Sequence, residues 1–321
     1  MFLLFFFFIF FSQENNSEVS LPEKVKSLLF EEENSNNNLD KKITKYSVSE
    51  VDLEKRFKEL ETGKIVYEYS TTKHGYVEKY LRMGNHFGKV IGLSEYYFPL
   101  FDEIFEKYKV PKELKYLTIV ESKLNPTITS RAGAKGLWQF MPQTAKNFKL
   151  ENNIYVDERI DPVKSTIAAA KYLLLLHKYF GDWEMVMAAY NCGEGNLMKA
   201  IKRSGGKNTY WQVRNFLPAE TRGYVPSFIA ANYLLNYYEE HNINVQKFKY
   251  SYKDTDTILV KNTISFDKIS KKINVSLEDI AFLNPQYKLK IIPKSTNKKY
   301  YLRLPKNKIE EFSQQKTDIT E

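Results

Sequence analysis

Apolar residues recur at helical spacing along most of the chain after about residue 53. One group of such positions is Val77, Tyr80 and Leu81. A second group is unusually aromatic and consists of Phe98, Phe101, Ile104, Phe105 and Tyr108. Residues three and four positions apart share one face of an α-helix, so each group predicts an amphipathic helix. We interpret both faces as core contacts and not as a platform for a ligand.

Two further helices are predicted in the second half of the chain. Asp161 is well placed to cap a helix whose first residue is Pro162. Residues 168–176 are apolar on nearly every side, so we expect this helix to be central, and Gly181 predicts its left-handed end. The next helix is predicted over residues 183–190.

The spacing of apolar residues changes from a helical to a mixed pattern near the C-terminus. Polarity rises and the period shortens over residues 245–253, which predicts a domain boundary. The order strand, helix, helix, strand is predicted over 257–260, 265–270, 276–283 and 300–305. Ser276 and Asp279 are spaced as a capping box. We therefore expect a small α+β module over residues 253–307, followed by a tail over residues 308–321.

The N-terminus begins with an unbroken run of Phe, Leu and Ile over residues 2–11. A membrane-spanning helix needs about 20 apolar residues, so this run predicts a signal peptide or an N-terminal anchor over residues 1–12. Residues 13–52 are rich in Asn, Glu, Ser and Lys and predict a polar, disordered linker with at most a short helix at 25–30.

Composition narrows the class of partner. The chain has 321 residues and a formal net charge of +9. Because its Lys residues are scattered and no zinc-finger or RNA-binding signature is present, we exclude nucleic acid. Carboxylate-rich peptidoglycan or a membrane surface fits this diffuse basicity. Cys192 is the only cysteine, so no intramolecular disulfide forms, and the four histidines lack metal-ligand spacing. We expect no metal and no cofactor.

A candidate general acid stands at Glu121. Leu114, Leu117 and Glu121 share one helix face, and Asn125 with Pro126 predicts the end of that helix. Both partial burial and the negative end of the helix dipole raise the pKa of a carboxyl group. A glutamic acid that is protonated at neutral pH can act as a general acid.

Residues that suit a ligand site follow Glu121. Residues 130–136 include small side chains that let the backbone approach a ligand, and residues 137–142 add apolar surface and one amide. The carboxylates Asp157, Glu158 and Asp161 receive no chemical role, because capping and pairing with Arg159 explain them.

These motifs resemble the catalytic domain of the soluble lytic transglycosylases, a lysozyme-like family (glycoside hydrolase family 23). The matching residues are Glu121-Ser122, Ser130, Gly133-Ala134, Gly136 to Phe140, Ala188 to Asn191 and Gly193 to Gly195. The likeness runs from about residue 97 to residue 238 and is nearest to the membrane-bound lytic murein transglycosylase D type. It implies a mainly α fold, with an all-helical, lysozyme-like catalytic domain over residues 53–247.

The resemblance also implies a site. Glu121 would be the catalytic residue. The groove would be lined by Ser130, Gln139, Met141, Tyr190, Asn191 and Glu220. From the residues alone, we would interpret Tyr190 as a core tyrosine with a satisfied hydroxyl and Glu220 as a surface partner of Arg222.

The activity implied is cleavage of the β-1,4 bond between N-acetylmuramic acid and N-acetylglucosamine in peptidoglycan, with formation of a 1,6-anhydro sugar. No second catalytic Asp stands out beside Glu121, which fits substrate assistance by the acetamido group. A goose-type lysozyme-like hydrolase, a peptidoglycan-binding scaffold and an enzyme acting on chitin remain as alternatives. The oligomeric state stays open.

The C-terminal module resembles LysM. Its opening differs, since Asp254-Thr255-Asp256-Thr257 stands where LysM has Gly-Asp-Thr. The module is interpreted either as a glycan-binding domain or as a docked structural appendage. The resemblance implies an exported protein of the periplasm or cell envelope, and no lipoprotein cysteine follows the N-terminal apolar run.

Overall fold

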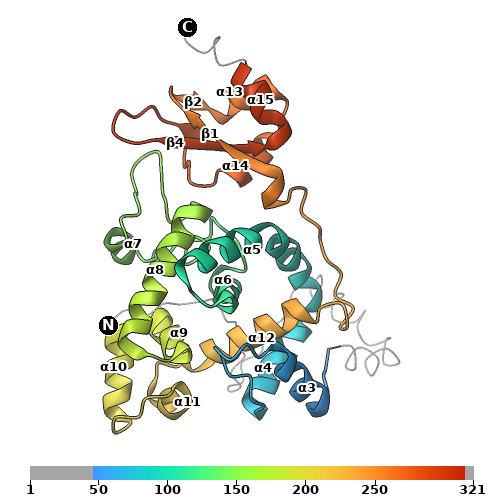
Figure 1. Ribbon diagram of the computed structural model, residues 1–321, viewed down its shortest axis with the longest axis vertical. Coiled ribbons are helices and arrows are strands. Elements are labelled where there is room, and N and C mark those ends of the chain that lie inside the picture. The colour runs from blue at the N-terminus through green and yellow to red at the C-terminus, as the bar shows by residue number, and fades with distance from the viewer. Residues whose placement is uncertain (1–45, 315–321) are drawn as a thin grey trace, which may run out of the picture.

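The computed structural model describes residues 46–314 and contains a helical domain below a smaller C-terminal module (Figure 1). The predicted signal peptide or anchor and nearly all of the predicted linker lie outside the described residues. Within residues 46–314, no helix has the length and apolar character needed to cross a bilayer.

The helical domain is built almost entirely from helices. Its α-helices are α3 (Glu50–Leu60), α4 (Thr71–Arg82), α5 (Gly88–Tyr108), α6 (Leu117–Ser122), α7 (Pro142–Asn147), α8 (Pro162–Phe180), α9 (Trp183–Cys192), α10 (Glu194–Arg203), α11 (Tyr210–Val213) and α12 (Tyr224–Asn236). Short 3₁₀ turns connect them: η1 (Gly84–Phe87), η2 (Lys112–Tyr116), η3 (Arg214–Phe216) and η4 (Thr221–Gly223). Helix α3 begins at Glu50, a little earlier than the sequence pattern predicts, because the Ser49 hydroxyl caps it by accepting a hydrogen bond from the Asp52 amide.

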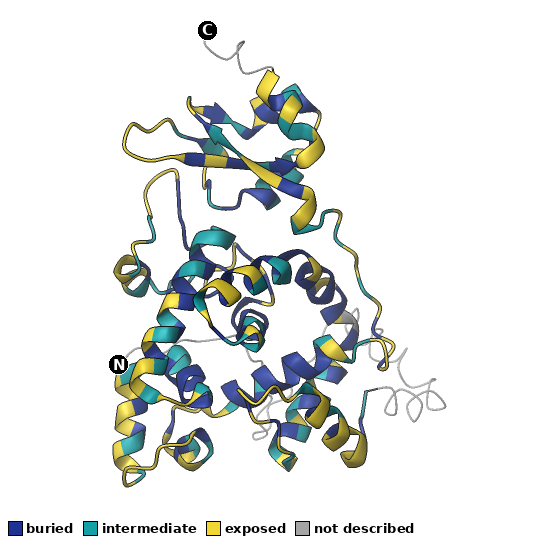
Figure 2. Ribbon diagram, viewed as in Figure 1, coloured by how far each residue is buried: buried dark blue, intermediate teal, exposed yellow. Residues whose placement is uncertain are grey.

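Helix α6 lies inside a ring formed by α5, α8, α9 and α12 (Figure 1). Both α6 and α12 are buried along most of their length (Figure 2). The aromatic face of α5 packs into this centre: Phe101 and Phe105 are fully buried and contact Trp138, with ring centroids 5.4 and 5.6 Å apart. The prediction that this face is core is confirmed.

Helix α8 has the predicted ends. The Asp161 carboxylate accepts hydrogen bonds from the amides of Val163 and Lys164, and Gly181 terminates the helix at φ 71°. The prediction that the helix is central holds for only one side, because Leu175 is 41% exposed and Tyr179 is 70% exposed.

The C-terminal module contains the predicted strand, helix, helix, strand order. Strand β1 (Thr255–Val260) follows the turn η5 (Tyr252–Asp254) and pairs antiparallel with β4 (Tyr300–Pro305), and β2 (Ile264–Ser265) pairs antiparallel with β3 (Ile291–Ile292). Helices α13 (Phe266–Ile273) and α14 (Leu277–Leu283) lie between the two outer strands in sequence. A further helix, α15 (Lys306–Gln314), occupies residues expected to be a tail, and its Phe312 is buried in the module's core. The mainly α fold with a small α+β module is confirmed.

The chain between the two parts is seated against α5. Gly88 and Gly92 lie one turn apart on α5, and a Cβ atom added to them would lie 2.1 Å from the carbonyl oxygen of Asn244 and 1.9 Å from that of Gln246. The Gln246 amide donates a hydrogen bond of 3.0 Å to the Gly88 carbonyl oxygen. Only residues without a side chain allow the connecting backbone to approach the helix this closely.

We expect Gly92→Ala to lower the free energy of unfolding by about 1–3 kcal/mol, since the new methyl group must displace backbone. Gly75→Ala in α4 is the matched control, because a Cβ there meets no atom within 4 Å. That control should be neutral or stabilise the fold by up to about 1 kcal/mol. Denaturant unfolding of both variants measures the difference. Equal free energies of unfolding for the two variants would contradict the close packing of residues 244–246 on α5.

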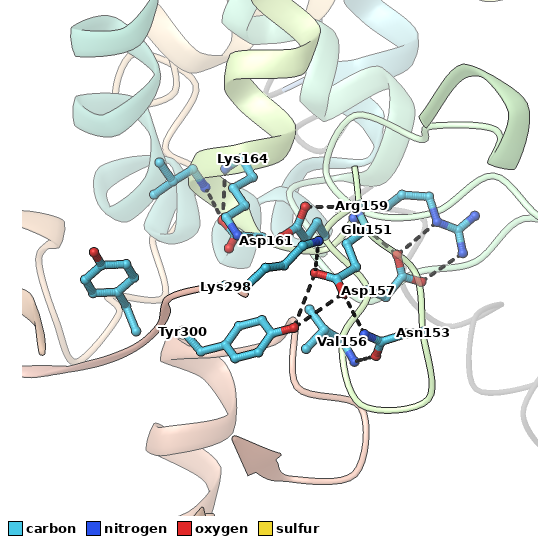
Figure 3. A network of polar contacts seen from close by, with 12 residues as sticks. Glu151, Asn153, Val156, Asp157, Arg159, Asp161, Lys164, Lys298 and Tyr300 are labelled. Atoms are coloured by element: carbon cyan, nitrogen blue, oxygen red, sulfur yellow. Dashed lines mark hydrogen bonds and ion pairs between the residues drawn. The ribbon is translucent and has the colours of Figure 1, made fainter. Parts of the chain in front are cut away.

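The module docks on the loop that follows α7 (Figure 3). Lys298 forms an ion pair of 2.7 Å with Glu151, and the Asp157 amide donates to the Gln286 carbonyl oxygen at 3.0 Å. Val156 of the helical domain is part of the module's core, whereas Leu283 of the module is part of the core of the helical domain. Each part therefore completes the apolar core of the other.

Candidate active site

Glu121 lies in the last turn of α6, as predicted, and is 7% exposed. The helix ends at Ser122, earlier than the expected end at Asn125 and Pro126. Lys123 (φ 51°) and Leu124 (φ 58°) both adopt the left-handed conformation, and their amides donate back to the carbonyl oxygens of Ile119 and Thr118. This hydrogen-bonded C-terminus closes the helix before the proline acts.

The carboxyl group of Glu121 has one close partner. The Tyr224 hydroxyl, at the first residue of α12, donates a hydrogen bond of 2.5 Å to Glu121 Oε1. Burial raises the pKa of Glu121 to about 8, the Tyr224 hydrogen bond lowers it, and the charge of Glu220 raises it. Burial is the larger cause, so Glu121 is mostly protonated at neutral pH.

Tyr190 lies in the last turn of α9 and is half-buried. Its hydroxyl donates a hydrogen bond of 2.8 Å to the Trp138 carbonyl oxygen. Burial and the nearby charge of Glu121 hold the pKa of Tyr190 well above its ordinary value. Tyr190 is therefore a neutral phenol beside Glu121 that also fixes the loop carrying Trp138.

Glu220 lies close enough to Glu121 for its charge to act on the Glu121 carboxyl group, and it contacts Asn191. The Asn191 side chain is hydrogen-bonded to the Glu220 carboxylate, and Thr221 Oγ1 donates to Asn191 Oδ1 at 2.8 Å. Partial desolvation raises the pKa of Glu220, and the bond from Asn191 opposes this. Among the described residues Glu220 forms no ion pair with Arg222, whose Nε donates instead to the Leu217 carbonyl oxygen at 3.0 Å.

Ser130 and Gln139 stabilise their own loop. Ser130 Oγ accepts a hydrogen bond from the Ala134 amide at 3.0 Å, and Gln139 Nε2 donates to the Gly136 carbonyl oxygen at 2.9 Å. Gln139 is 9% exposed and has a left-handed backbone (φ 47°). Met141 is half-buried and precedes α7.

The expected apolar surface over residues 137–142 is largely internal. Leu137, Trp138 and Phe140 are between 0 and 2% exposed. Trp138 Nε1 donates to Thr166 Oγ1 at 2.9 Å, which anchors the indole between α5 and α8. The interpretation of this stretch as ligand-facing is wrong for these three residues, since they pack into the core.

A buried ion pair between Arg159 and Asp157 stabilises the loop over residues 130–136 (Figure 3). Arg159 and Asp157 pair at 2.8 Å, and Arg159 Nη1 also donates to the Gly133 carbonyl oxygen at 2.9 Å. Lys135 lies 3.5 Å from Asp157. As predicted, Asp157 pairs with Arg159 and Asp161 caps α8, but Glu158 pairs with Lys164 at 2.5 Å and not with Arg159.

Three cavities are outlined in the described part of the chain, with volumes of about 410, 320 and 460 Å³. Glu121 lines none of these three. The first is bounded by Leu217, Pro218 and Arg222, which directly flank the segment that carries Glu220.

The structure thus brings Glu121, Tyr190, Asn191 and Glu220 into one cluster and adds Tyr224, which sequence reasoning missed. Tyr224 is separated from Glu121 by 103 positions. The sequence offered one indication of the role of Tyr224, since this residue follows the candidate residue Glu220 by four positions.

Comparison with known proteins defines the class of domain. Residues 99–213 match the transglycosylase SLT domain, and residues 254–321 match the LysM-like domain of lytic transglycosylase MltD. The chain therefore carries a transglycosylase SLT domain followed by a LysM-like domain, which confirms the resemblance found in its motifs.

Particular relatives are membrane-bound and soluble lytic murein transglycosylases. Membrane-bound lytic murein transglycosylase D of Escherichia coli K12 is 39% identical over 172 residues, which cover 52% of this chain and 38% of that protein. The soluble lytic murein transglycosylase of the same strain is 31% identical over 163 residues, covering 47% and 25%. The chain thus spans well under half the length of these relatives.

Solved structures with a similar chain include the 70 kDa soluble lytic transglycosylase of E. coli, at 27% identity and a TM-score of 0.38 over 46% of this chain and 25% of that chain. A complex of the 70 kDa soluble lytic transglycosylase with bulgecin A aligns at 22% identity with a TM-score of 0.41, covering 70% of this chain and 35% of that chain.

Proposed function

We propose that this protein is a peptidoglycan lytic transglycosylase that cleaves the β-1,4 bond from N-acetylmuramic acid to N-acetylglucosamine. The observation that carries the proposal is a buried glutamic acid, Glu121, with a pKa near 8 inside an SLT domain. A carboxyl group that holds its proton at neutral pH is suited to protonate a leaving oxygen.

In the first half of the reaction Glu121 donates its proton to the glycosidic oxygen as the bond to C1 of N-acetylmuramic acid breaks. Since Tyr224 donates to Oε1, the proton is carried by Oε2. The carbonyl oxygen of the substrate's own acetamido group stabilises the cationic C1, which removes the need for a second catalytic carboxylate.

In the second half the Glu121 carboxylate removes the proton of the C6 hydroxyl, and O6 attacks C1 to close the 1,6-anhydro ring. Glu121 ends protonated and no water is consumed. The Tyr224 hydrogen bond stabilises the transient carboxylate, whereas burial and Glu220 stabilise the acid, so the two forms stay close in energy.

The remaining candidate residues would bind the sugars. Ser130, Gln139 and Asn191 would offer hydrogen bonds, Met141 an apolar contact with a ring, and Tyr190 a phenol beside the reacting bond. Glu220 would support the site from the side opposite the loop. The clustering of Tyr190, Asn191 and Glu220 around Glu121 supports this assignment.

We place the protein at the cell envelope as an exported enzyme whose binding partner is the peptidoglycan glycan strand. The name of the E. coli relative, a membrane-bound enzyme, supports this location. The LysM-like domain would add a second contact with glycan.

Product analysis on purified sacculi tests the proposal. We expect muropeptides that end in 1,6-anhydro-N-acetylmuramic acid, lighter by one water molecule than the products of a hydrolase. Products that contain the added water would instead identify a goose-type lysozyme-like hydrolase. Binding to sacculi without any soluble product would identify a scaffold.

The pH profile of kcat/KM should follow the proton on Glu121. Since the acid form starts the reaction and its pKa is raised to about 8, activity should fall as pH rises through about 8. Tyr224→Phe removes a hydrogen bond that favours the carboxylate, so it should move the falling limb to higher pH. Glu220→Gln removes a charge that favours the acid, so it should move the limb to lower pH. Shifts of the same sign in both variants would contradict the assignment.

A further inference from the structure

The loop that follows α7 pairs with the C-terminal module as if it were one of its strands. We call residues 151–159 the docking loop. The Asp157 amide donates to the Gln286 carbonyl oxygen at 3.0 Å, and the Lys288 amide donates to the carbonyl oxygen two residues before Asp157 at 2.8 Å. Val156, between these two bonds, is 1% exposed and lies in the apolar core of the module. The position of the docking loop therefore depends on the module.

The docking loop also holds the loop over residues 130–140, which we call the site loop. The Asp157 carboxylate is 1% exposed and accepts hydrogen bonds from Arg159 Nε and Nη2 at 3.0 and 2.8 Å (Figure 3). Burial raises the pKa of this carboxyl group, but the hydrogen bonds and the charge of Arg159 lower it by more, so Asp157 is ionised. Lys135 Nζ lies 3.5 Å from the same carboxylate, and Arg159 Nη1 donates to the Gly133 carbonyl oxygen at 2.9 Å. Both cations thus join the site loop to Asp157.

The site loop carries two candidate sugar-binding residues, Ser130 and Gln139, and is bonded to the helix that carries the acid. Gly133 donates its amide to the Ser130 carbonyl oxygen at 2.9 Å. Ser122 Oγ, in the residue after the acid, donates to the Leu137 carbonyl oxygen at 2.9 Å. A continuous series of bonded groups therefore runs from the module, through the docking loop, to the candidate site.

We propose that the module is a positioning part of the active site: by fixing Asp157 and Arg159 it holds the site loop in the conformation that binds a sugar. Separating Asp157 from Arg159 would leave two buried charges without partners, which is strongly unfavourable, so the two loops move together. Asp157 and Arg159 act through the site loop and do not themselves touch the substrate. The inference rests on the proposed function, since it requires glycan to bind at the candidate site.

The test uses Val156→Ala in the full chain, which weakens the contact between the docking loop and the module. Val275→Ala is the matched control. Val275 lies between α13 and α14 in the same apolar core, and in the described structure it forms no β-bridge with the docking loop. Both variants remove the same side-chain atoms from one core, so both should lose a similar amount of stability.

We expect Val156→Ala to raise KM for peptidoglycan by about 3- to 10-fold, the value of about one hydrogen bond to a sugar, and Val275→Ala to leave KM unchanged. A general loss of folded protein would lower kcat alone, so a rise in KM reports the position of the site loop. The same KM in the two variants would overturn the proposal.

Arg159→Lys tests the bond between the two loops. A lysine ammonium keeps a charge beside Asp157 but lacks the planar fork that bonds Asp157 and Gly133 at once. We expect a similar rise in KM, and a less than additive effect when this change is combined with Val156→Ala, because both changes interrupt one series of contacts. Fully additive effects would show that the two residues act independently and would overturn the proposal.

Hydrogen exchange separates this inference from the proposed function, because it needs no substrate. Exchange is followed in peptides covering residues 130–140 of the wild-type chain and of both valine variants. We expect these amides to exchange about 5- to 10-fold faster in Val156→Ala than in Val275→Ala. If the wild-type chain releases no product from sacculi, the proposed function fails, while the exchange rates still decide whether the module holds the site loop. Equal exchange in the two variants of an active enzyme would overturn the positioning role and leave the proposed function in place.

Discussion

Glu121→Gln is expected to lose turnover of peptidoglycan by about 10²–10⁴-fold or more, since the amide keeps the shape of the side chain but cannot donate the catalytic proton or take one back. Binding to sacculi should persist, because Gln keeps an oxygen that can accept the Tyr224 hydrogen bond. The measurements are the rate of anhydro-muropeptide release and the fraction of protein that sediments with sacculi.

Glu184→Gln is the control for this variant. Glu184 is also a buried glutamate whose burial raises its pKa, here to about 7, and it accepts a hydrogen bond from Trp211 Nε1 at 3.2 Å. It lies in the first turn of α9, at the opposite end of the helix from Tyr190 and Asn191. We expect this variant to keep turnover. Full activity in Glu121→Gln would refute the assignment of the acid.

Gly136→Ala should destabilise the fold more than an alanine at Gly92 or at Gly133. Gly136 has φ 88°, and a Cβ there would lie 2.1 Å from the Arg159 carbonyl oxygen. A left-handed alanine costs about 1–2 kcal/mol and the clash about 1–3 kcal/mol more. We therefore expect a loss of about 2–5 kcal/mol in the free energy of unfolding, measured by denaturant titration, together with loss of activity.

Gly133→Ala separates the cost of the left-handed backbone from the cost of the steric clash. Gly133 has nearly the same backbone conformation (φ 85°), but a Cβ there meets no atom within 4 Å. Its cost should be limited to the strained backbone, about 1–2 kcal/mol. If both alanine variants lose the same stability, the close packing of the site loop against Arg159 does not contribute.

Local chemistry made much of the helical framework predictable. The Asp161 cap, the glycine at 181 and the aromatic stripe of α5 each act over a few residues, and each appears where the pattern placed it. The burial and raised pKa of Glu121 were also predicted, from two leucines on its helix face. The exact end of α6 was not, because two consecutive left-handed residues have no side-chain signature at Lys123 and Leu124.

Contacts between distant segments could not be predicted from helical spacing; the family resemblance supplied Tyr190, Asn191 and Glu220 as neighbours of Glu121, but not Tyr224. The Tyr224 hydroxyl reaches Glu121 only because α12 packs against α6. Trp138 was expected to contribute apolar surface to a ligand site, whereas α5 and α8 enclose it. Whether Gln139 faces substrate or its own loop likewise depends on the left-handed turn that it adopts. Helical spacing identifies apolar faces, but it does not identify the partner that covers each face.

Residues 244–246 pack directly on Gly88 and Gly92 of α5, and the module contacts the loop after α7. The connecting chain is therefore not a flexible linker between two independent parts. Surface complementarity, and not the number of connecting residues, sets how far the module stands from Glu121. Phe248 and Tyr252 add to this attachment, since both rings contact Tyr96 of α5.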